Sequence, residues 1–337
     1  VDREEQQYGE QTREMFGHQY SERLIHALFR EVREELGMDL FELYQHGELT
    51  NLCLIGEAST PEFQSVRFQT YFFAIELCQR PSFAVDKGEV ESWHWRPATE
   101  WLKLYHRGEL LMVPPTKHVF EYFESYGIPN WEAPQCEDFN LRYTSTLHVP
   151  MLENVKGIVQ YLPLSHTFPP ANRTNCFLLG EDKRVLVDPS PKDPEELEKL
   201  IRSVKRDLAS DALDLIFLTH HHTDHYEHVL ELNESFGVPL GMSRDTYQRI
   251  LNHQGIDYFE NQEVRFFQEG DILCHSLGHE VKIYEVPGHD EGQLAFAPKN
   301  MNWFMAGDLI QTVGTVVIGG DEGDMAKYFS SLNRVIE

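Results

Sequence analysis

The stretch LTHHHTDHYEH, residues 218–228, constrains this chain more than any other part of its sequence. Histidine occupies five of its eleven positions, and an aspartate lies among them. On a helix, residues two apart point to nearly opposite sides, whereas on extended backbone they point to the same side. The apolar run LDLIFL precedes the stretch. We therefore predict that a strand ends here and that His220, His222 and Asp224 project to one side. His225 turns away as a helix begins, which suits two neighbouring metal ions.

Two later segments offer further ligands at predicted strand ends. His289 follows a Pro-Gly turn in EVPGHDEG, and Asp308 follows a glycine in NWFMAGDLI. Asp188, in VLVDPS, is predicted to be a structural residue near the site. Taken singly, such a histidine or aspartate is more often a surface residue than a ligand. The rival interpretation of the cluster, a pH-sensitive surface, predicts no matching ligands at later strand ends. We favour a metal site, with His221 and His228 outside the ligand set.

Composition limits the partners of this chain. Its 337 residues predict two domains, and the 41% hydrophobic content is enough for packed cores. The formal net charge is −26, which repels phosphate backbones, so a small-molecule substrate is favoured over nucleic acid. Five widely spaced cysteines form no CxxC pair, and no apolar run approaches the roughly 20 residues of a membrane span. A cytoplasmic chain without a membrane segment is expected.

Short apolar strands alternate with turns from residue 155 onward, and helices are predicted at 194–207, 226–236 and 323–336. Many strands with a few covering helices predict two sheets between helix layers, an αββα arrangement. The predicted strands are GIVQYLPL, NCFLLG, RVLVDPS, LIFLTH, VPLGM, KIYEVPG, QLAFAP and NWFMAGD.

The order of these motifs carries a family resemblance. H-x-H-x-D-H, a later P-G-H and a later G-D resemble the metallo-β-lactamase superfamily over about residues 155–337. ANRTNCFLLGEDKRVLVDPSP resembles the opening hairpin of that fold, and GTVVIGGDEGDMAKYFSSLNRVIE resembles the segment after its bridging aspartate. Within the superfamily, the chain is most similar to the branch that holds glyoxalase II-like thioesterases and β-lactamase-like endoribonucleases.

The resemblance implies a ligand set and a reaction. Two zinc ions suit it, and iron or manganese suit such mixed sites as well. The implied reaction is metal-assisted hydrolysis of an ester, thioester or phosphodiester. Asp224 would be catalytic, because it would orient the attacking water and accept its proton. By position, the first zinc would be held by His220, His222 and His289, the second by Asp224 and His225, and Asp308 would bridge them.

The chain departs from the family pattern in two places. Tyr226, Glu227 and His228 stand where the family commonly has two small residues, which predicts a differently shaped pocket mouth. The family also supplies one more ligand histidine beyond its final helix, whereas this sequence ends at Glu337. We expect that the C-terminal part of the domain is missing, with His228 as the nearest substitute ligand.

The N-terminal region is predicted to contain helices and strands. Leu24, Leu28 and Val32 recur at helical spacing in a helix over 20–36, which Gly37 ends. Strands are predicted at RFQTYFFAIEL and SWHWRP, and a second helix at HVFEYFESYG. Residues 128–153 show no clear period and are predicted to be a linker.

Three glutamates on the first helix form a second candidate metal site. Glu31, Glu34 and Glu35 lie within about 100° of arc, and oxygen ligands suit Mg²⁺ or Mn²⁺. The simpler interpretation is a charged helix face with pairs such as Arg30 with Glu34. However, REVREELGM resembles the core of the Nudix box. That resemblance implies a Nudix-like α/β/α domain over 1–127, lacking its first strands, that hydrolyses diphosphates of nucleotides or coenzyme A-like molecules.

Three hypotheses follow for the whole chain. In the first, residues 154–337 form the metallo-β-lactamase-like hydrolase, joined through the linker 128–153 to the Nudix-like domain. In the second, the Nudix-like half carries the main activity and the other half binds or regulates. In the third, one domain only binds a ligand. Since both sets of ligand-type residues are present, an enzyme is favoured.

Overall fold

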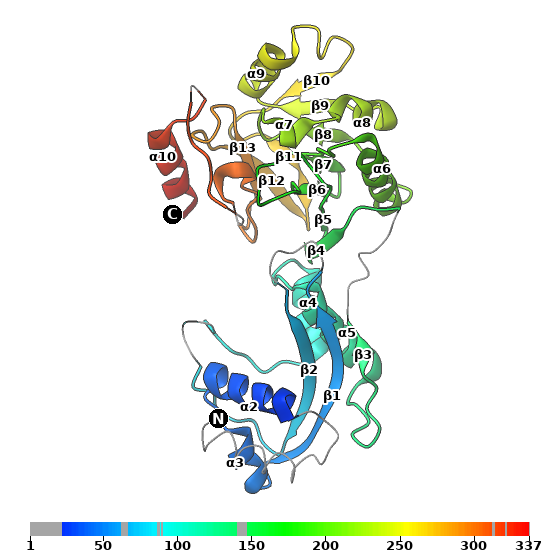
Figure 1. Ribbon diagram of the computed structural model, residues 1–337, viewed down its shortest axis with the longest axis vertical. Coiled ribbons are helices and arrows are strands. Elements are labelled where there is room, and N and C mark those ends of the chain that lie inside the picture. The colour runs from blue at the N-terminus through cyan, green and yellow to red at the C-terminus, as the bar shows by residue number, and fades with distance from the viewer. Residues whose placement is uncertain are drawn as a thin grey trace. The chain divides into compact units, whose positions relative to one another are not determined.

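The computed structural model describes residues 22–61, 67–85, 88, 90–139, 147–311, 314–320 and 322–336 (Figure 1). The chain forms two compact units. The N-terminal unit comprises Val1–Trp101 and His118–Asn140, and the C-terminal unit comprises Leu102–Lys117 and Leu141–Glu337. Among the described helices, none is long and apolar enough to cross a membrane.

The N-terminal unit is built on a three-stranded sheet in the order β2-β1-β3. β1 (Leu49–Ser59) pairs antiparallel with β2 (Gln69–Leu77) and parallel with the short β3 (Glu137–Asp138). One apolar cluster joins the sheet to α2 (Glu22–Leu36) and α3 (Leu40–Gln45). A second cluster joins it to the part of α5 (Pro114–Tyr126) that lies in this unit. The region is therefore an α/β/α arrangement, and its assignment to the Nudix family stays a prediction.

The predicted elements of this unit are partly confirmed. α2 matches the predicted helix, and Gly37 ends it with φ +64°. SWHWRP was wrongly predicted as a strand, because residues 92–97 have no regular structure. The ring of Trp95 stacks on Phe83 instead, at 5.4 Å between centroids. β1 was not predicted, since bulges interrupt its pairing and obscure the alternation.

The larger sheet of the C-terminal unit has seven strands in the order β10-β9-β8-β7-β6-β5-β4. β4 to β7 pair antiparallel, and β7 to β10 pair parallel. The strands are β4 (Met151–Val155), β5 (Ile158–Tyr161), β6 (Cys176–Leu179), β7 (Val185–Val187), β8 (Leu215–Phe217), β9 (Leu240–Met242) and β10 (Val264–Phe266). The parallel strands are connected through α6 (Pro194–Leu208), α7 (Thr223–Tyr226), α8 (Val229–Phe236) and α9 (Arg244–Gln254).

A second, antiparallel sheet completes this unit. It contains β11 (Ile272–Ser276), β12 (His279–Glu285) and β13 (Leu294–Pro298). The short helix η1 (Gly307–Leu309) follows, and then α10 (Met325–Ile336). α6 and α8 lie along the large sheet, and α10 lies beside the small one (Figure 1).

Burial in β8 shows how the layers are stacked. Ile216 packs in the cluster that includes α6, α8 and α9, whereas Leu215 and Phe217 pack in the cluster that includes β11, β12 and β13. Side chains alternate between faces along a strand, so the large sheet is covered on both sides. On the outer face of the small sheet, Ala295 of β13 and Val286, which directly follows β12, pack against α10. The predicted αββα sandwich is confirmed.

Some predicted elements of the C-terminal unit need correction. NWFMAGD is not a strand, because only an isolated bridge between Phe296 and Met305 forms there before η1. The helix predicted at 226–236 is split into α7 and α8, since His228 adopts a positive φ of 58°. β4, β10, β11 and α9 were not predicted.

The two units divide the chain at different places from the predicted domains. Leu102–Lys117 belongs to the C-terminal unit, where the Tyr105 hydroxyl donates to the Glu153 carbonyl at 2.9 Å. The Met112 N–H donates to the Asn154 carbonyl at 3.1 Å. Part of the predicted linker, including β3, lies in the N-terminal unit. Spacing along the chain cannot reveal these long-range bonds. Residues 1–21 and 140–146, on which other predictions rest, lie outside the described residues.

Candidate metal centre

The histidine cluster lies where β8 ends, as predicted. β8 stops at Phe217, and His222 has extended dihedral angles (φ −70°, ψ 139°) just before α7 begins. His220 is fully buried, while the side chain of His222 is 29% exposed. One nitrogen of each ring points toward the other ring, with His220 Nε2 and His222 Nδ1 3.1 Å apart.

Two distant segments bring further ligand atoms to these rings. His289 Nε2 lies 3.0 Å from His222 Nδ1 and 3.5 Å from Asp308 Oδ2. His289 follows β12, and Asp308 lies in η1. Together His220, His222, His289 and Asp308 offer four ligand atoms that all lie within 4.8 Å of one another. Residues separated by nearly ninety positions thus converge on one point.

The loop that carries His289 is held tightly against α10. Gly288 has φ +134°, and a Cβ placed on it would lie 2.2 Å from the backbone nitrogen of Tyr328. The Gly288 carbonyl accepts from the Asp324 N–H at 2.8 Å, and the Ser331 hydroxyl donates to the Pro287 carbonyl at 2.7 Å. Only glycine allows this close approach. The Pro-Gly turn therefore fixes the position of His289.

Hydrogen bonds at the far side of two rings decide which nitrogen faces the cluster unprotonated. His289 Nδ1 lies 2.8 Å from the Val317 carbonyl, which can only accept, so Nδ1 carries the proton. The Thr219 hydroxyl donates to Asp188 at 2.7 Å and accepts from His220 Nδ1 at 3.0 Å. In the neutral rings, the Nε2 lone pairs of His220 and His289 therefore both face His222 Nδ1. A proton on His222 Nδ1 can form a hydrogen bond with only one of these two lone pairs. A metal cation can accept both lone pairs, so a cation fits this set of nitrogen donors.

Asp188 forms hydrogen bonds both with Thr219, beside His220, and with His225. It accepts from the Thr219 N–H at 2.8 Å and from His225 Nδ1 at 2.9 Å, and it is almost fully buried. His225 Nε2 lies 3.3 Å from Asp308 Oδ1, so Asp308 lies between His225 and His289. Asp188 has a positive φ of 47°, a strained conformation for a residue other than glycine. This matches its prediction as a structural residue near the site.

Burial and neighbouring charges shift the pKa values of these histidines in different directions. Burial lowers the pKa of His222 to about 4, and burial likewise places the pKa of His220 well below its usual value. Burial also opposes a charged His225, but the carboxylates of Asp308 and Asp188 outweigh it and raise the pKa of His225. Burial would raise the pKa of Asp308, yet pairing with His225 holds it far below its usual range. Neutral imidazoles suit metal binding, which requires deprotonated ligands.

Asp224 is placed differently from the prediction. It lies inside α7 and is half-buried, and it is not one of the four converging ligand atoms among the described residues. The prediction treated residues 220–224 as one extended segment. However, α7 begins at Thr223, so the alternation of extended backbone does not reach Asp224, and its place in the ligand set stays a prediction.

The two predicted bystanders differ from each other. His228 is the half-buried N-terminal cap residue of α8, 3.1 Å from Glu231, and it is not part of the cluster. His221 is buried, and its two ring nitrogens lie beside Asp290 and Glu322. Together with His222 and Glu322 it forms a second group of ligand-type atoms that lie within 4.8 Å of one another. Sequence reasoning missed both acidic partners, and only the adjacency of Asp290 to His289 hinted at one of them.

The three glutamates of α2 do not converge in the same way. Glu31 forms a 2.6 Å ion pair with Arg30, whose guanidinium lies 3.8 Å from Glu34. Both glutamate side chains are at least half exposed. In the part of the chain that the structure describes, the groups of converging ligand atoms include none of Glu31, Glu34 and Glu35. The geometry therefore favours the charged helix face, and the magnesium site stays a prediction.

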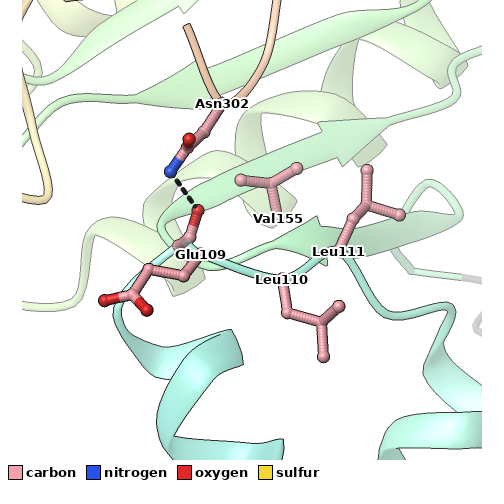
Figure 2. A pocket seen from close by; sticks show the side chains of 6 residues that line it. Glu109, Leu110, Leu111, Val155 and Asn302 are labelled. Atoms are coloured by element: carbon pink, nitrogen blue, oxygen red, sulfur yellow. Dashed lines mark hydrogen bonds between the residues drawn. The ribbon is translucent and has the colours of Figure 1, made fainter. Parts of the chain in front are cut away.

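A separate small cavity of about 70 Å³ lies elsewhere in the C-terminal unit (Figure 2). Two of its lining residues are joined by the hydrogen bond from the Asn302 amide to the Gly108 carbonyl, which is 2.7 Å long (Figure 2). None of its lining residues belongs to the histidine cluster. Those residues are Gly108, Glu109, Leu110, Leu111, Val155 and Asn302.

Comparisons with known proteins find relatives of the C-terminal half of the chain. A family model described as "Metallo-beta-lactamase superfamily" matches residues 169–337. The chain is 31% identical to a hydroxyacylglutathione hydrolase of Bdellovibrio bacteriovorus over 163 residues, which are 47% of this chain and 57% of that protein. It is 27% identical to the hydroxyacylglutathione hydrolase GloC of Haemophilus influenzae, with 48% of this chain and 78% of that protein covered.

A solved metallo-beta-lactamase from Pontibacter korlensis is also similar. Its sequence identity is 16%, its TM-score is 0.46, and the match covers 56% of this chain and 85% of that one. Of the curated relatives, the Bdellovibrio bacteriovorus protein is matched over little more than half of its own length.

Proposed function

The chain belongs to the metallo-beta-lactamase superfamily, and from that premise we propose that its C-terminal unit is a metal-dependent hydrolase. The observation that carries this proposal is the convergence of His220, His222 and His289 with Asp308 at one point. Three imidazole nitrogens and a carboxylate form a donor set that suits zinc or iron.

The residues divide into two ligand groups in this proposal. His220, His222 and His289 hold the first metal through the nitrogens that face one another. Asp308 reaches both groups, since its two oxygens lie 3.5 Å from His289 and 3.3 Å from His225. His225 and Asp224 serve the second metal in this proposal, and Asp188 orients His225 from the other side of its ring. This contact supports a bridging role for Asp308.

When bound, such a metal pair supplies Lewis-acid polarisation and activates water for hydrolysis. The protein keeps the ligand groups fixed and largely dry, because His220, His225 and His289 are buried. Asp224 is proposed as the group that orients the attacking water and accepts its proton. It is half-buried in α7, one residue before His225.

We further propose a thioester as the substrate class. Both curated relatives described above are named hydroxyacylglutathione hydrolases. The formal net charge of −26 also disfavours a phosphodiester polymer, which carries the same sign. An acylated small thiol agrees with both observations.

Metal analysis and hydrolysis assays together test this proposal. The purified chain is expected to carry close to two zinc or iron equivalents and to cleave small acyl thioesters faster than carboxylic or phosphate esters. The His220→Ala, His222→Ala double variant should lose both properties, while His228→Ala should keep them. A wild-type chain that binds no transition metal would refute the hydrolase assignment, and preferential cleavage of phosphodiesters would refute the thioester substrate.

A further inference from the structure

His221 stands between two proposed ligands, yet both of its ring nitrogens face acidic side chains. Its Nδ1 lies 2.5 Å from Asp290 Oδ2, and its Nε2 lies 3.2 Å from Glu322 Oε1. The His221 side chain is 2% exposed and the Asp290 side chain is fully buried. Burying a carboxylate and an imidazole together is costly unless further polar contacts satisfy both groups.

Asp290 connects His221 to the loop that carries His289. It is the next residue after His289, and its Oδ1 accepts from the Gly292 N–H at 2.8 Å. The Gly292 carbonyl accepts in turn from the Ser243 hydroxyl at 2.8 Å, at the start of α9. Arg249 of α9 lies 3.7 Å from Asp290 Oδ2. The carboxylate is therefore fixed to its own loop, and that loop is fixed to α9.

Glu322 connects His221 to the segment before α10 and to a ligand. Its Oε1 lies 3.2 Å from His221 Nε2 and 3.3 Å from His253 Nε2. Its Oε2 lies 3.7 Å from His222 Nε2, the nitrogen on the side of that ring away from the cluster. The rings of His221 and His222 are also neighbours, with centroids 4.7 Å apart.

We propose that His221 is a positioning residue that couples the two ligand-bearing segments of the metal centre. Through Asp290 it holds the loop of His289 at a fixed distance from His220 and His222. Through Glu322 it holds the carboxylate that faces the outer nitrogen of His222. The inference rests on the proposed function, because positioning matters only if these histidines bind a metal. Partners behind metal ligands typically change metal affinity by about 10- to 100-fold when they are removed.

A positioning role of the His221–Asp290 pair can be distinguished from a purely structural role by measuring metal binding. A purely structural pair would lower the stability of the metal-free protein and leave the coordination geometry of the folded, loaded protein unchanged. A positioning pair changes the affinity and the ligand field of the metal. Co²⁺ in place of the native metal reports the ligand field directly through its visible absorption.

The experiment compares full-length His221→Gln, Asp290→Asn and the double variant with the wild type. His228→Gln is the matched control, since His228 has a similar contact with Glu231 at 3.1 Å but no contact with the cluster. We expect each single variant to bind its tightest Zn²⁺ about 10- to 100-fold more weakly, measured by competition with a chromophoric chelator. The Co²⁺ spectrum should shift in both single variants. The Zn²⁺ affinity of the double variant should be no lower than that of the weaker-binding single variant. The control should match the wild type in affinity and spectrum.

Asp290→Asn preserves side-chain size, so it serves if His221→Gln fails to fold. Wild-type affinity and an unchanged Co²⁺ spectrum in the folded Asp290→Asn variant would overturn the proposal while leaving the hydrolase assignment intact. Losses that multiply in the double variant would overturn it too, because His221 and Asp290 would then act separately. A wild-type chain that binds neither Zn²⁺ nor Co²⁺ would overturn the proposed function itself, and this inference with it.

Discussion

The two units each contain a cluster of ligand-type residues, and the clusters differ in how they are assembled. Glu31, Glu34 and Glu35 lie on one helix, where ordinary helical spacing places them close together. His220, His289 and Asp308 come from segments far apart in the chain and meet in a buried position. Neighbours on a helix need no explanation beyond the helix, whereas distant residues meet only because the fold brings them together.

The partners of the two clusters differ in the same way. Arg30 lies beside Glu31 and Glu34, so the glutamate charges are balanced at the solvent-exposed surface. In the histidine cluster, the groups behind the rings are the Val317 carbonyl, Thr219 and Asp188, and they orient the rings toward one another. A set of oriented nitrogen lone pairs is much stronger evidence for a metal than a set of exposed carboxylates.

Removing a central histidine should have the largest effect. In His222→Ala, the nitrogen that lies within 3.1 Å of both His220 and His289 is lost. We expect loss of the tightly bound metal and a fall in thioester hydrolysis of more than about 100-fold, beyond the range for loss of an outer partner. Metal analysis of the purified variant and steady-state rates measure both. If the folded variant kept its full metal content, the histidine cluster would have no better claim to be a metal site than the glutamates of α2.

Asp188→Asn should have the next largest effect. The substitution keeps the shape but removes the charge that accepts from Thr219 and His225. We expect metal affinity to fall by about 10- to 100-fold and the free energy of unfolding of the metal-free protein to fall by about 1–3 kcal/mol. Chelator competition and urea denaturation measure these quantities. Asp182→Asn, at an exposed carboxylate paired with His275, is the control and should leave metal affinity unchanged.

The two metal positions should differ in their response to pH. The pKa of His222 is about 4 and that of His220 is also lowered, so these ligands are neutral from about pH 6 upward. The pKa of His225 is raised, so a proton must leave Nε2 before a metal binds there. Affinity at the second position should therefore rise by up to about tenfold per pH unit below the raised pKa, while affinity at the first stays nearly constant. Calorimetric titrations at several pH values, in buffers of different ionisation enthalpy, measure both. Equal pH dependence at the two positions would contradict this division.

Glu34→Gln should have the smallest effect. Glu34 is 64% exposed and its distance from Arg30 is 3.8 Å, so little stability depends on this pair. We expect the melting temperature, zinc content and thioester hydrolysis to match the wild type. The same variant tests the predicted diphosphate hydrolase. If the wild type released a monophosphate from nucleotide diphosphates with Mg²⁺ and Glu34→Gln did not, the helix would be a metal site after all.

Residue spacing alone predicted part of the candidate metal centre. Alternation in H-x-H on extended backbone placed His220 and His222 on one side, and the later motifs P-G-H and G-D supplied His289 and Asp308. The αββα layers also followed from the order of strands and helices. The place of Asp224 in the ligand set stays a prediction, because a helix begins one residue earlier, at Thr223, where the alternation of extended backbone ends. Spacing could not anticipate Glu322, which meets His221 across 101 positions of sequence.

What the sequence determined by itself was local: which residues have ligand chemistry, which strand they follow, and the alternation that turns His220 and His222 the same way. Backbone geometry repeats over a few residues, so this information is readable from spacing. Only the tertiary structure decided that His221 is buried against Asp290, that Asp188 orients His225, and that Glu31 and Glu34 stay exposed beside Arg30. These outcomes depend on contacts between segments far apart in the chain, and such contacts are set by packing of the whole core rather than by local conformation.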